Sequence, residues 1–399
     1  MTNKEIEQAL QTPTEIKWAG EPLLGAPYGE EEIEAVVAAI RDSMDITKGF
    51  GFFAQPIKDF EAEFAKYVGT KFAGAVNSCG PGLDIVMRYL DLQPGDEVIV
   101  PCINYVAAPL AVLGAGGTIV WAEVRESDLL LDPADVERKM SPRTRAIFPV
   151  HIHGMSAPMD EYIAIAERHP HPVHGPAKVI GDAARACGGD YKGTKIGKMG
   201  WATVFSFQTM KNMTTLGEGG MITTDDPDLD AYIHDVRMYG TWVGAWGTSN
   251  VMTKPQAAAG LVQLRKLDSF IAARRRIAKA RNEMLAGTPG VVLPVDPECK
   301  EHSFYLYPLM LTPELAGEAR DRIMKRMREE FGVATFIANP PVYDVHPLIK
   351  KATTRRTPLA EAYAKRNICL PIQPQMSDHD NRYITAAFIK CLNDEMAKL

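Results

Sequence analysis

The chain has 399 residues, which is enough for one large and one small domain, and its composition is that of an ordinary soluble globular protein. A net charge of -6 argues against a dedicated nucleic-acid binder, because such a protein needs a clustered positive surface. The first residues, MTNKEIEQALQ, lack the apolar core of a signal peptide, and no window approaches eighteen uninterrupted apolar residues. We therefore expect a cytoplasmic enzyme without a membrane partner.

From about residue 56 onwards, helix-like and strand-like segments alternate along the chain. The helix-like segments have apolar residues at helical spacing, whereas the strand-like segments are short and almost continuously apolar. Such strands are typical of a largely parallel sheet that helices cover on both faces, so the pattern predicts an α/β fold. We expect helices at 56–69, 83–92, 107–116, 133–140 and 159–169, and strands at 72–78, 96–101, 118–124, 145–154 and 177–184.

The alternation ends near Arg237, where a loop rich in Gly and Trp leads into a long helix at about 254–286. Pro255 suits the first turn of that helix, because the N–H that proline lacks has no partner there. The pattern then predicts a strand at 302–311, a helix at 318–331, a strand at 333–339 and two final helical stretches. We predict an N-terminal arm at residues 1–30, a large α/β domain at 31–270 and a small α+β domain at 271–399, with the long helix as connector.

A lone lysine, Lys211, lies between two predicted strands in the stretch VFSFQTMKNMTTLGEGG at 204–220. Its neighbours on both sides are apolar or small, which favours a protected pocket where desolvation frees the amine as a nucleophile. A solvated surface lysine is the alternative that this stretch alone leaves open.

The junction NSCGPGL at 77–83 joins a predicted strand to a predicted helix. Small residues, with Pro81 expected at the first helical position, leave backbone N–H groups free to bind an anion such as phosphate. Ser78 adds a hydroxyl donor. The alternative is a tight turn that binds nothing.

Asp182 follows the apolar residues VIG at the carboxyl end of a predicted strand, where open α/β sheets place their ligands. An N-cap or a loop ion pair is the alternative. Together, the anion turn, Asp182 and Lys211 answer three needs of pyridoxal phosphate: a phosphate site, a carboxylate for the pyridine nitrogen and an amine for the Schiff base. Tyr105, just after the strand at 96–101, is a candidate for stacking on the pyridine ring, although such a residue is also common in packing.

Other motifs give weaker support for other functions. GFGFFA at 49–54 matches a dinucleotide pattern, but no strand precedes it. His151 and His153 on a predicted strand, with His169, His171 and His174, lack the spacing of a metal site, and we predict no metal. Ser206 lacks the GxSxG of a hydrolase. Six scattered cysteines without CxxC spacing indicate neither a disulfide framework nor a zinc site.

The chain resembles the DegT/DnrJ/EryC1/StrS aminotransferases, a family of fold-type-I pyridoxal phosphate enzymes that aminate keto-sugars and keto-cyclitols. The resemblance covers almost the whole chain and is carried by NSCGPGL, VIGDAARACGGDYKG, FSFQTMKNMTTLGEGGMITTDD and LPIQPQMSDHD. It implies a homodimer with shared active sites, and glutamate or glutamine as amino donor. It further implies that Lys211 forms the internal aldimine, that Asp182 binds the pyridine nitrogen, that Ser78, Cys79, Gly80 and Ser206 hold the phosphate, and that Tyr105 stacks on the ring.

The resemblance also leaves alternatives and departures. Related sugar dehydratases have histidine at the position of Lys211, so the lysine favours transamination over dehydration. The alternatives are a pyridoxal phosphate dehydratase or lyase of the same fold and a non-catalytic regulatory protein. Arg185 stands where the family has Gln or His, and a contact with the cofactor, with a substrate anion or with a structural partner is open. Leu216 resembles an insertion in the family's TTGEGG. Asn250, or Ser249 in the other register, is our choice for the phosphate contact from the partner subunit.

Overall fold

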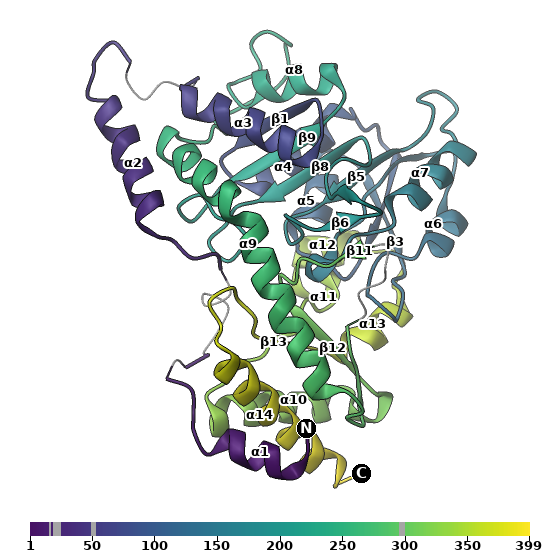
Figure 1. Cartoon of the computed structure of the whole chain (residues 1–399). Helices are drawn as coiled ribbons and strands as arrows, with labels where there is room; N and C mark the ends of the chain where they lie inside the picture. Colours follow the sequence, from purple (N-terminus) through teal and green to yellow (C-terminus); the bar gives the residue numbers. More distant parts are fainter. Residues whose placement is uncertain (16, 19–24, 49–52, 295–299) are drawn as a thin grey trace.

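The computed structural model describes residues 1–15, 17–18, 25–48, 53–294 and 300–399. Its centre is a seven-stranded sheet in which only β9 runs antiparallel to its neighbours. The predicted α/β fold with a mostly parallel sheet is thus confirmed (Figure 1). In spatial order the strands are β1 (Phe72–Val76), β9 (Gly220–Thr224), β8 (Ala202–Ser206), β5 (Lys178–Asp182), β4 (Thr144–Ile147), β2 (Glu97–Pro101) and β3 (Thr118–Ala122).

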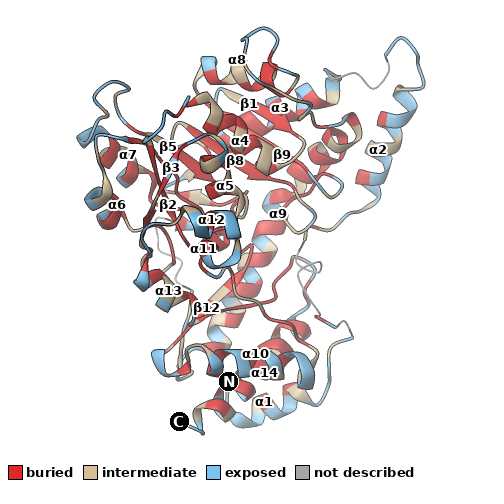
Figure 2. Ribbon diagram, turned by 180° about the vertical axis from the view of Figure 1, so that it is seen from behind, coloured by how far each residue is buried: buried red, intermediate tan, exposed pale blue. Residues whose placement is uncertain are grey.

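Helices cover both faces of this sheet. Successive residues of a strand point to opposite faces, and because these strands are apolar throughout, each face must be covered. In β8, Val204 belongs to one apolar core and Phe205 to another on the opposite face. Figure 2 shows the strands as the most buried part of the molecule. The helices of this region are α3 (Gln55–Val68), α4 (Cys79–Tyr89), α5 (Ala107–Gly114), α6 (Pro133–Lys139), α7 (Met159–Arg168) and α8 (Pro227–Val236).

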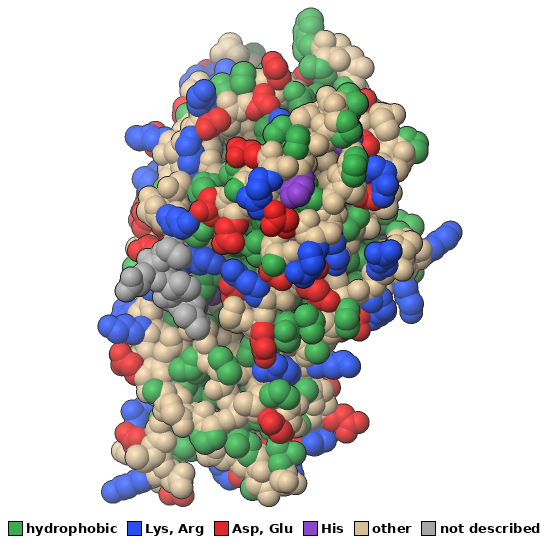
Figure 3. Space-filling view, turned by 90° about the vertical axis from the view of Figure 1, so that its right-hand side faces the viewer, with side chains coloured by type: hydrophobic (Ala, Val, Ile, Leu, Met, Phe, Trp, Pro, Cys, Tyr) green, Lys and Arg blue, Asp and Glu red, His purple; other side chains and the backbone are tan. Residues whose placement is uncertain are grey.

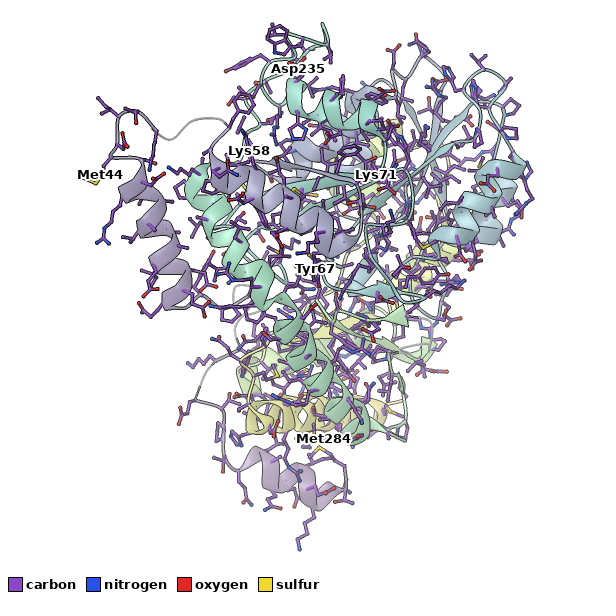
Figure 4. The ribbon with its side chains drawn as sticks, turned by 45° about the horizontal axis from the view of Figure 1, so that its top comes forward. Met44, Lys58, Tyr67, Lys71, Asp235 and Met284 are labelled. Atoms are coloured by element: carbon purple, nitrogen blue, oxygen red, sulfur yellow. The ribbon has the colours of Figure 1, made fainter. Side chains whose placement is uncertain are left out.

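The long helix α9 (Lys254–Leu285) runs from the sheet to the C-terminal part of the chain (Figure 1). Thr253 caps it together with Gln256, and Pro255 occupies its first turn as predicted. At its far end, the amino group of Met1 donates to the carbonyl of Met284 at 2.7 Å, and Figure 4 labels Met284 beside α1 (Asn3–Leu10). Helix α2 (Glu30–Asp42) lies against α9 through the ion pair of Glu32 with Lys266.

A separate apolar core lies in the C-terminal part and includes Ile6 and Ala9 of α1. The predicted division into residues 1–30, 31–270 and 271–399 stays a prediction. The elements of the C-terminal part are the antiparallel sheet of β10 (Val291–Val292), β12 (Tyr307–Leu311) and β13 (Asn367–Leu370), and the helices α10 (Glu318–Phe331), α11 (Val342–Val345), α12 (Pro347–Ala352), α13 (Pro358–Ala364) and α14 (Asp378–Met396). The buried residues of α11, α12 and α13 pack into the core of the large sheet. A small sheet pairs β11 (Lys300–Glu301) of the C-terminal part with β6 (Asp190–Tyr191), which also pairs with β7 (Thr194–Lys195), and these last two strands belong to the large region in sequence.

Four expectations about local structure were wrong. The strand expected at 145–154 ends at Ile147, because Pro149 has no N–H to continue the ladder, and His151 and His153 lie beyond it. The strand expected at 302–311 begins only at Tyr307, after Phe304 with a left-handed φ of 46°.

Residues 333–339 form no strand; only Phe336 bridges to Cys369. Helix α4 begins at Cys79, so Pro81 is its third residue rather than its first. This position tolerates proline, because the first four N–H groups of a helix have no partner within it. Residues 49–52 of the GFGFFA motif lie outside the described residues.

On the face shown in Figure 3, Lys and Arg side chains alternate with Asp and Glu. Among the described residues, no helix combines the length and the apolar character needed to cross a membrane. The same part of the chain holds no cluster of three or more His, Cys, Asp or Glu suited to a metal ion.

Candidate active site

A cavity of about 410 Å³ lies at the carboxyl ends of the parallel strands. It brings together residues that are far apart in the sequence, from the turn after β1 to Asn339. Eight of the nine residues proposed for the site line it: Ser78, Cys79, Gly80, Tyr105, Asp182, Arg185, Ser206 and Lys211.

One end of the cavity is formed by the N-terminus of α4. Ser78 is the N-cap residue, but its hydroxyl makes no capping bond, so the first N–H groups of the helix remain available to an anion. A Cβ on Gly80 would meet no atom within 4 Å, which leaves space beside these donors. A Cβ on Gly220 would lie 2.8 Å from the backbone N of Cys79, so only glycine allows β9 to begin this close to the turn.

Two hydroxyl groups flank the same end. Ser78 Oγ donates to Glu218 Oε2 at 2.9 Å, which holds the hydroxyl at the cavity wall. Ser206 is the last residue of β8, directly opposite Gly220 in the strand register. Its Oγ accepts from the backbone N of Gln208 at 3.4 Å, so its hydroxyl hydrogen is free to donate to a ligand.

Asp182, the last residue of β5, is a buried carboxylate with a single polar contact. Its Oδ1 accepts from the backbone N of Ala184 at 3.0 Å, and its Oδ2 has no hydrogen-bond partner in the described part of the chain. Burial raises the pKa of Asp182, more than the nearby charges of Arg185 and Lys211 lower it. A cationic N–H placed in the cavity would both satisfy Oδ2 and stabilise the carboxylate.

Lys211 enters the cavity from the turn between β8 and β9. Its Nζ lies 4.8 Å from the centroid of the Tyr305 ring, a distance suited to a cation–π contact. The turn is fixed from beneath, because Asn212 Nδ2 donates to the carbonyl of Cys187 at 3.0 Å and to Ser303 Oγ at 3.1 Å. Leu216 has a left-handed φ of 61°.

Arg185 lies on the cavity wall three residues after Asp182. Its Nη1 donates to the carbonyl of Ala338 and its Nη2 to Asn339 Oδ1, both at 3.2 Å. The structural partner considered for Arg185 is therefore an uncharged backbone and amide pair rather than a carboxylate.

Tyr105 lines the cavity with 61% of its surface exposed, and its backbone N donates to Asn104 Oδ1 at 2.6 Å. Asn250 does not line the cavity of its own chain. Its carbonyl accepts from the backbone N of Asn77 at 2.9 Å, which places it behind the phosphate turn, and Ser249 bridges to Met238.

Burial raises the pKa of the Cys79 thiol well above its ordinary value, so this side chain is not a nucleophile. Its contribution to the turn is its backbone N–H.

The sequence did not single out several residues that line the cavity. Tyr305 and Asn339 come from the C-terminal part, and nothing in their local sequence marks them as ligands. Asn104 precedes Tyr105 and Gln208 lies three residues before Lys211. Their closeness in sequence to these predicted site residues is the one feature that could have indicated them. Asn104 Nδ2 is buried without a hydrogen-bond partner, so a polar group in the cavity would satisfy it.

Comparison with known proteins identifies the relatives of this chain. A sequence profile of the DegT/DnrJ/EryC1/StrS aminotransferase family matches residues 27–389. The chain belongs to this family. Membership confirms the predicted aminotransferase and, with it, the pyridoxal phosphate on which the family's chemistry depends.

Two curated members of the family are similar over most of their length. The spore coat polysaccharide biosynthesis protein SpsC of Bacillus subtilis (strain 168) is 34% identical over 371 residues, which cover 88% of this chain and 92% of SpsC. The dTDP-3-amino-3,4,6-trideoxy-alpha-D-glucose transaminase of Streptomyces venezuelae is 34% identical over 361 residues, which cover 88% of this chain and 90% of that enzyme.

Among solved structures, S. venezuelae DesV in complex with a ketimine intermediate has a TM-score of 0.81 and 33% identity to this chain. The match covers 90% of this chain and 95% of DesV. The α/β fold of the chain is therefore the fold of this family.

The residues of the cavity fit pyridoxal phosphate. The free N–H groups of α4 and the hydroxyl of Ser206 suit a phosphate, and the hydroxyl of Ser78 suits it once its hydrogen turns away from Glu218. The unpartnered Oδ2 of Asp182 suits a protonated ring nitrogen. The amine of Lys211 lines the same cavity.

Proposed function

We propose that this protein transfers an amino group from an amino acid, glutamate or glutamine, to the carbonyl carbon of a keto-sugar. The observation that carries this proposal is that Lys211, Asp182 and the N-terminus of α4 line one cavity. These three groups are the amine, the carboxylate and the anion site that a pyridoxal phosphate aminotransferase requires.

Each residue has a distinct task in the proposed reaction. Pyridoxal phosphate, when bound, supplies an electron sink that allows the Cα–H bond of the donor to ionise. Asp182 holds a proton on the ring nitrogen, because a cationic N–H beside Oδ2 stabilises its buried carboxylate. Lys211 takes the Cα proton of the donor as a general base, with Tyr305 beside its amine.

The remaining residues bind and orient. Ser78, Gly80, Ser206 and the N–H of Cys79 hold the phosphate, and Tyr105 covers one face of the ring. In the second half of the reaction, Lys211 returns a proton as the acceptor carbon takes the nitrogen, so one amine serves both directions.

The proposed acceptor is a nucleotide-linked keto-sugar. The support is the S. venezuelae relative, which is named as a transaminase of a dTDP-linked amino sugar and shares 34% of its residues with this chain. A keto-cyclitol is the other acceptor considered. The two classes differ at the carbons away from the carbonyl, which contact loops and, in the proposed dimer, the partner subunit.

We further propose a homodimer in which Asn250, or Ser249, of one subunit reaches the phosphate site of the other. Support comes from large apolar side chains that are exposed near the cavity and on the adjoining loop: Tyr105, Trp242 and Trp246. Analytical ultracentrifugation tests the dimer; a monomer at micromolar concentration contradicts it. A cytoplasmic location is also proposed, supported by Cys79, Cys102, Cys187 and Cys391, which are buried and form no disulfide in the described part of the chain.

The test of function starts from enzyme loaded with pyridoxamine phosphate. Nucleotide-linked keto-sugars and keto-cyclitols are added in turn, and return of the visible absorbance of the pyridoxal form identifies the acceptor. The product mass distinguishes amination from dehydration. Protein that stays colourless when pyridoxal phosphate is added contradicts the proposal, and Lys211→Ala is the control that binds the cofactor without forming the lysine-linked chromophore.

A further inference from the structure

Arg185 is a cation on the cavity wall that makes no direct ion pair in the described part of the chain, although the charge of Asp182 lies near it. Its guanidinium donates two hydrogen bonds, to the carbonyl of Ala338 and to Asn339 Oδ1. A guanidinium has five N–H donors, so three remain available for a ligand. A positive charge held at the edge of a cavity without a direct ion pair favours an anionic ligand.

The orientation of Arg185 is set by the C-terminal part of the chain. Ala338 is buried, and its backbone N donates to Asn367 Oδ1 at 3.2 Å. Its carbonyl accepts a hydrogen bond from Nη1 of Arg185. Asn339 Oδ1 accepts a hydrogen bond from Nη2. Because both Nη atoms are thus bonded to the protein, the plane of the guanidinium is fixed before a ligand binds. Such a planar fork matches the two oxygens of a carboxylate.

Arg185 and Lys211 approach the same aromatic ring. The Cζ atom of Arg185 lies 5.8 Å from the centroid of Tyr305, and Lys211 Nζ lies 4.8 Å from it. The phosphate end of the cavity has its own hydrogen-bonding groups at Ser78 and Ser206, so Arg185 is not needed there. When the reacting carbon of a ligand lies beside Lys211, the group bonded to that carbon therefore lies near Arg185.

We propose that Arg185 binds the α-carboxylate of the amino donor and that Asn339 is a positioning residue for it; this inference rests on the proposed function. An α-carboxylate is bonded directly to the carbon that carries the exchanging nitrogen. A keto-sugar has only hydroxyl groups at the corresponding place. Arg185 therefore serves the half-reaction of the amino acid and not that of the sugar.

The two half-reactions allow a test within a single variant. Enzyme loaded with pyridoxamine phosphate reacts either with 2-oxoglutarate, which has the carboxylate, or with the keto-sugar acceptor, which lacks it. In Arg185→Gln, we expect kcat/KM for 2-oxoglutarate to fall roughly 100-fold, as for loss of a charge-assisted pair. The value for the keto-sugar should change less than about threefold, and Arg185→Lys should recover part of the loss.

A binding measurement accompanies the kinetics. α-Methylglutamate has no Cα proton to lose, so a spectral titration of the pyridoxal form gives its dissociation constant without turnover. We expect a rise of roughly 30-fold or more in Arg185→Gln and a smaller rise in Asn339→Ala. Arg265→Gln, on the exposed side of α9, is the matched control and should leave every value unchanged.

The outcomes separate the inference from the function on which it rests. If wild-type enzyme transaminates but Arg185→Gln loses 2-oxoglutarate and keto-sugar reactivity equally, or binds α-methylglutamate normally, the carboxylate role is wrong. Equal loss together with weaker binding of pyridoxal phosphate would instead assign Arg185 to the cofactor and also overturn the inference. If the wild type reacts with no amino or oxo acid, the proposed function itself fails.

Discussion

Asn212 Nδ2 donates to Ser303 Oγ at 3.1 Å, and this bond ties the residue after Lys211 to a segment 91 positions further along the chain. Both side chains are buried, and Ser303 Oγ lies 3.3 Å from the carbonyl of Gly154. The lysine turn is thus held against the segment that carries Tyr305.

We expect Asn212→Ala to lower the free energy of unfolding by about 2 kcal/mol, because the carbonyl of Cys187 loses its donor in a buried place. Ser303→Ala should cost about 1 kcal/mol. Urea denaturation of the two single variants and the double variant measures their coupling, which we expect to be about 0.5–1 kcal/mol. Strictly additive losses would show that the bond does not contribute.

Asp182→Asn should weaken cofactor binding and change the pH dependence of stability. Loss of the charge-assisted bond to the ring nitrogen should raise the dissociation constant of pyridoxal phosphate roughly 10- to 100-fold. Because burial raises the pKa of Asp182, the folded apoprotein binds this proton more tightly than the unfolded chain does. The wild-type free energy of unfolding therefore falls, relative to Asp182→Asn, as the pH rises from about 4.

Urea denaturation of both apoproteins between pH 4 and pH 8 measures this difference. The variant should be the more stable one at pH 7, and the two curves should converge toward pH 4. A variant that is less stable than wild type at pH 7 would mean that the carboxylate is stabilised by contacts other than the bond from Ala184.

Gly80→Ala and Gly220→Ala should separate cofactor binding from folding. The methyl group of Gly80→Ala enters open cavity space, so stability should change by less than about 0.5 kcal/mol while binding of pyridoxal phosphate weakens. The methyl group of Gly220→Ala meets the backbone of Ser78 and Cys79, which should cost about 1–3 kcal/mol. Cofactor titration and urea denaturation check both; normal cofactor affinity in Gly80→Ala would place the phosphate elsewhere.

His234 should stabilise the fold in a pH-dependent way. Burial lowers its pKa, but hydrogen bonds to Asp230 and Glu61 outweigh burial and raise it to about 9. The stabilisation is therefore complete below the unfolded pKa of about 6.5 and is lost as the pH rises through about 9. His234→Gln should cost about 1–2 kcal/mol at pH 6 and little at pH 10, as measured by urea denaturation. A cost that is the same at both pH values would contradict the charged pairing.

The sheet and the reactive ends of its strands were predictable because their signals are local. Strands such as β2 and β5 are short apolar runs, and Asp182 directly follows one of them. Residues 333–339 have a similar apolar pattern but bond differently: Ala338 uses its carbonyl for Arg185 and its N–H for Asn367. These partners lie far away in the sequence, so no local pattern distinguishes this segment from a strand.

The same reason limits prediction of the site. Ser78, Asp182 and Lys211 each adjoin a strand of one sheet, which places them at one edge before any contact is known. Tyr305 and Asn339 reach the cavity only because Ser303 and Ala338 are bonded to the large region, and those bonds are tertiary. The hydrogen bond of the Arg185 side chain to the carbonyl of Ala338, rather than to a carboxylate, likewise depends on tertiary packing.

Strand β9 separates β1 from β8, and within the described residues it is the only strand that pairs with β1. Until β9 has inserted, the turn at Ser78 has no fixed distance from Asp182 or Lys211, although its own helix can already form. Assembly of the cofactor site therefore requires β9 to be in place between β1 and β8. Visible colour on addition of pyridoxal phosphate consequently reports that this edge of the sheet has closed, which makes it a direct assay for correctly folded protein.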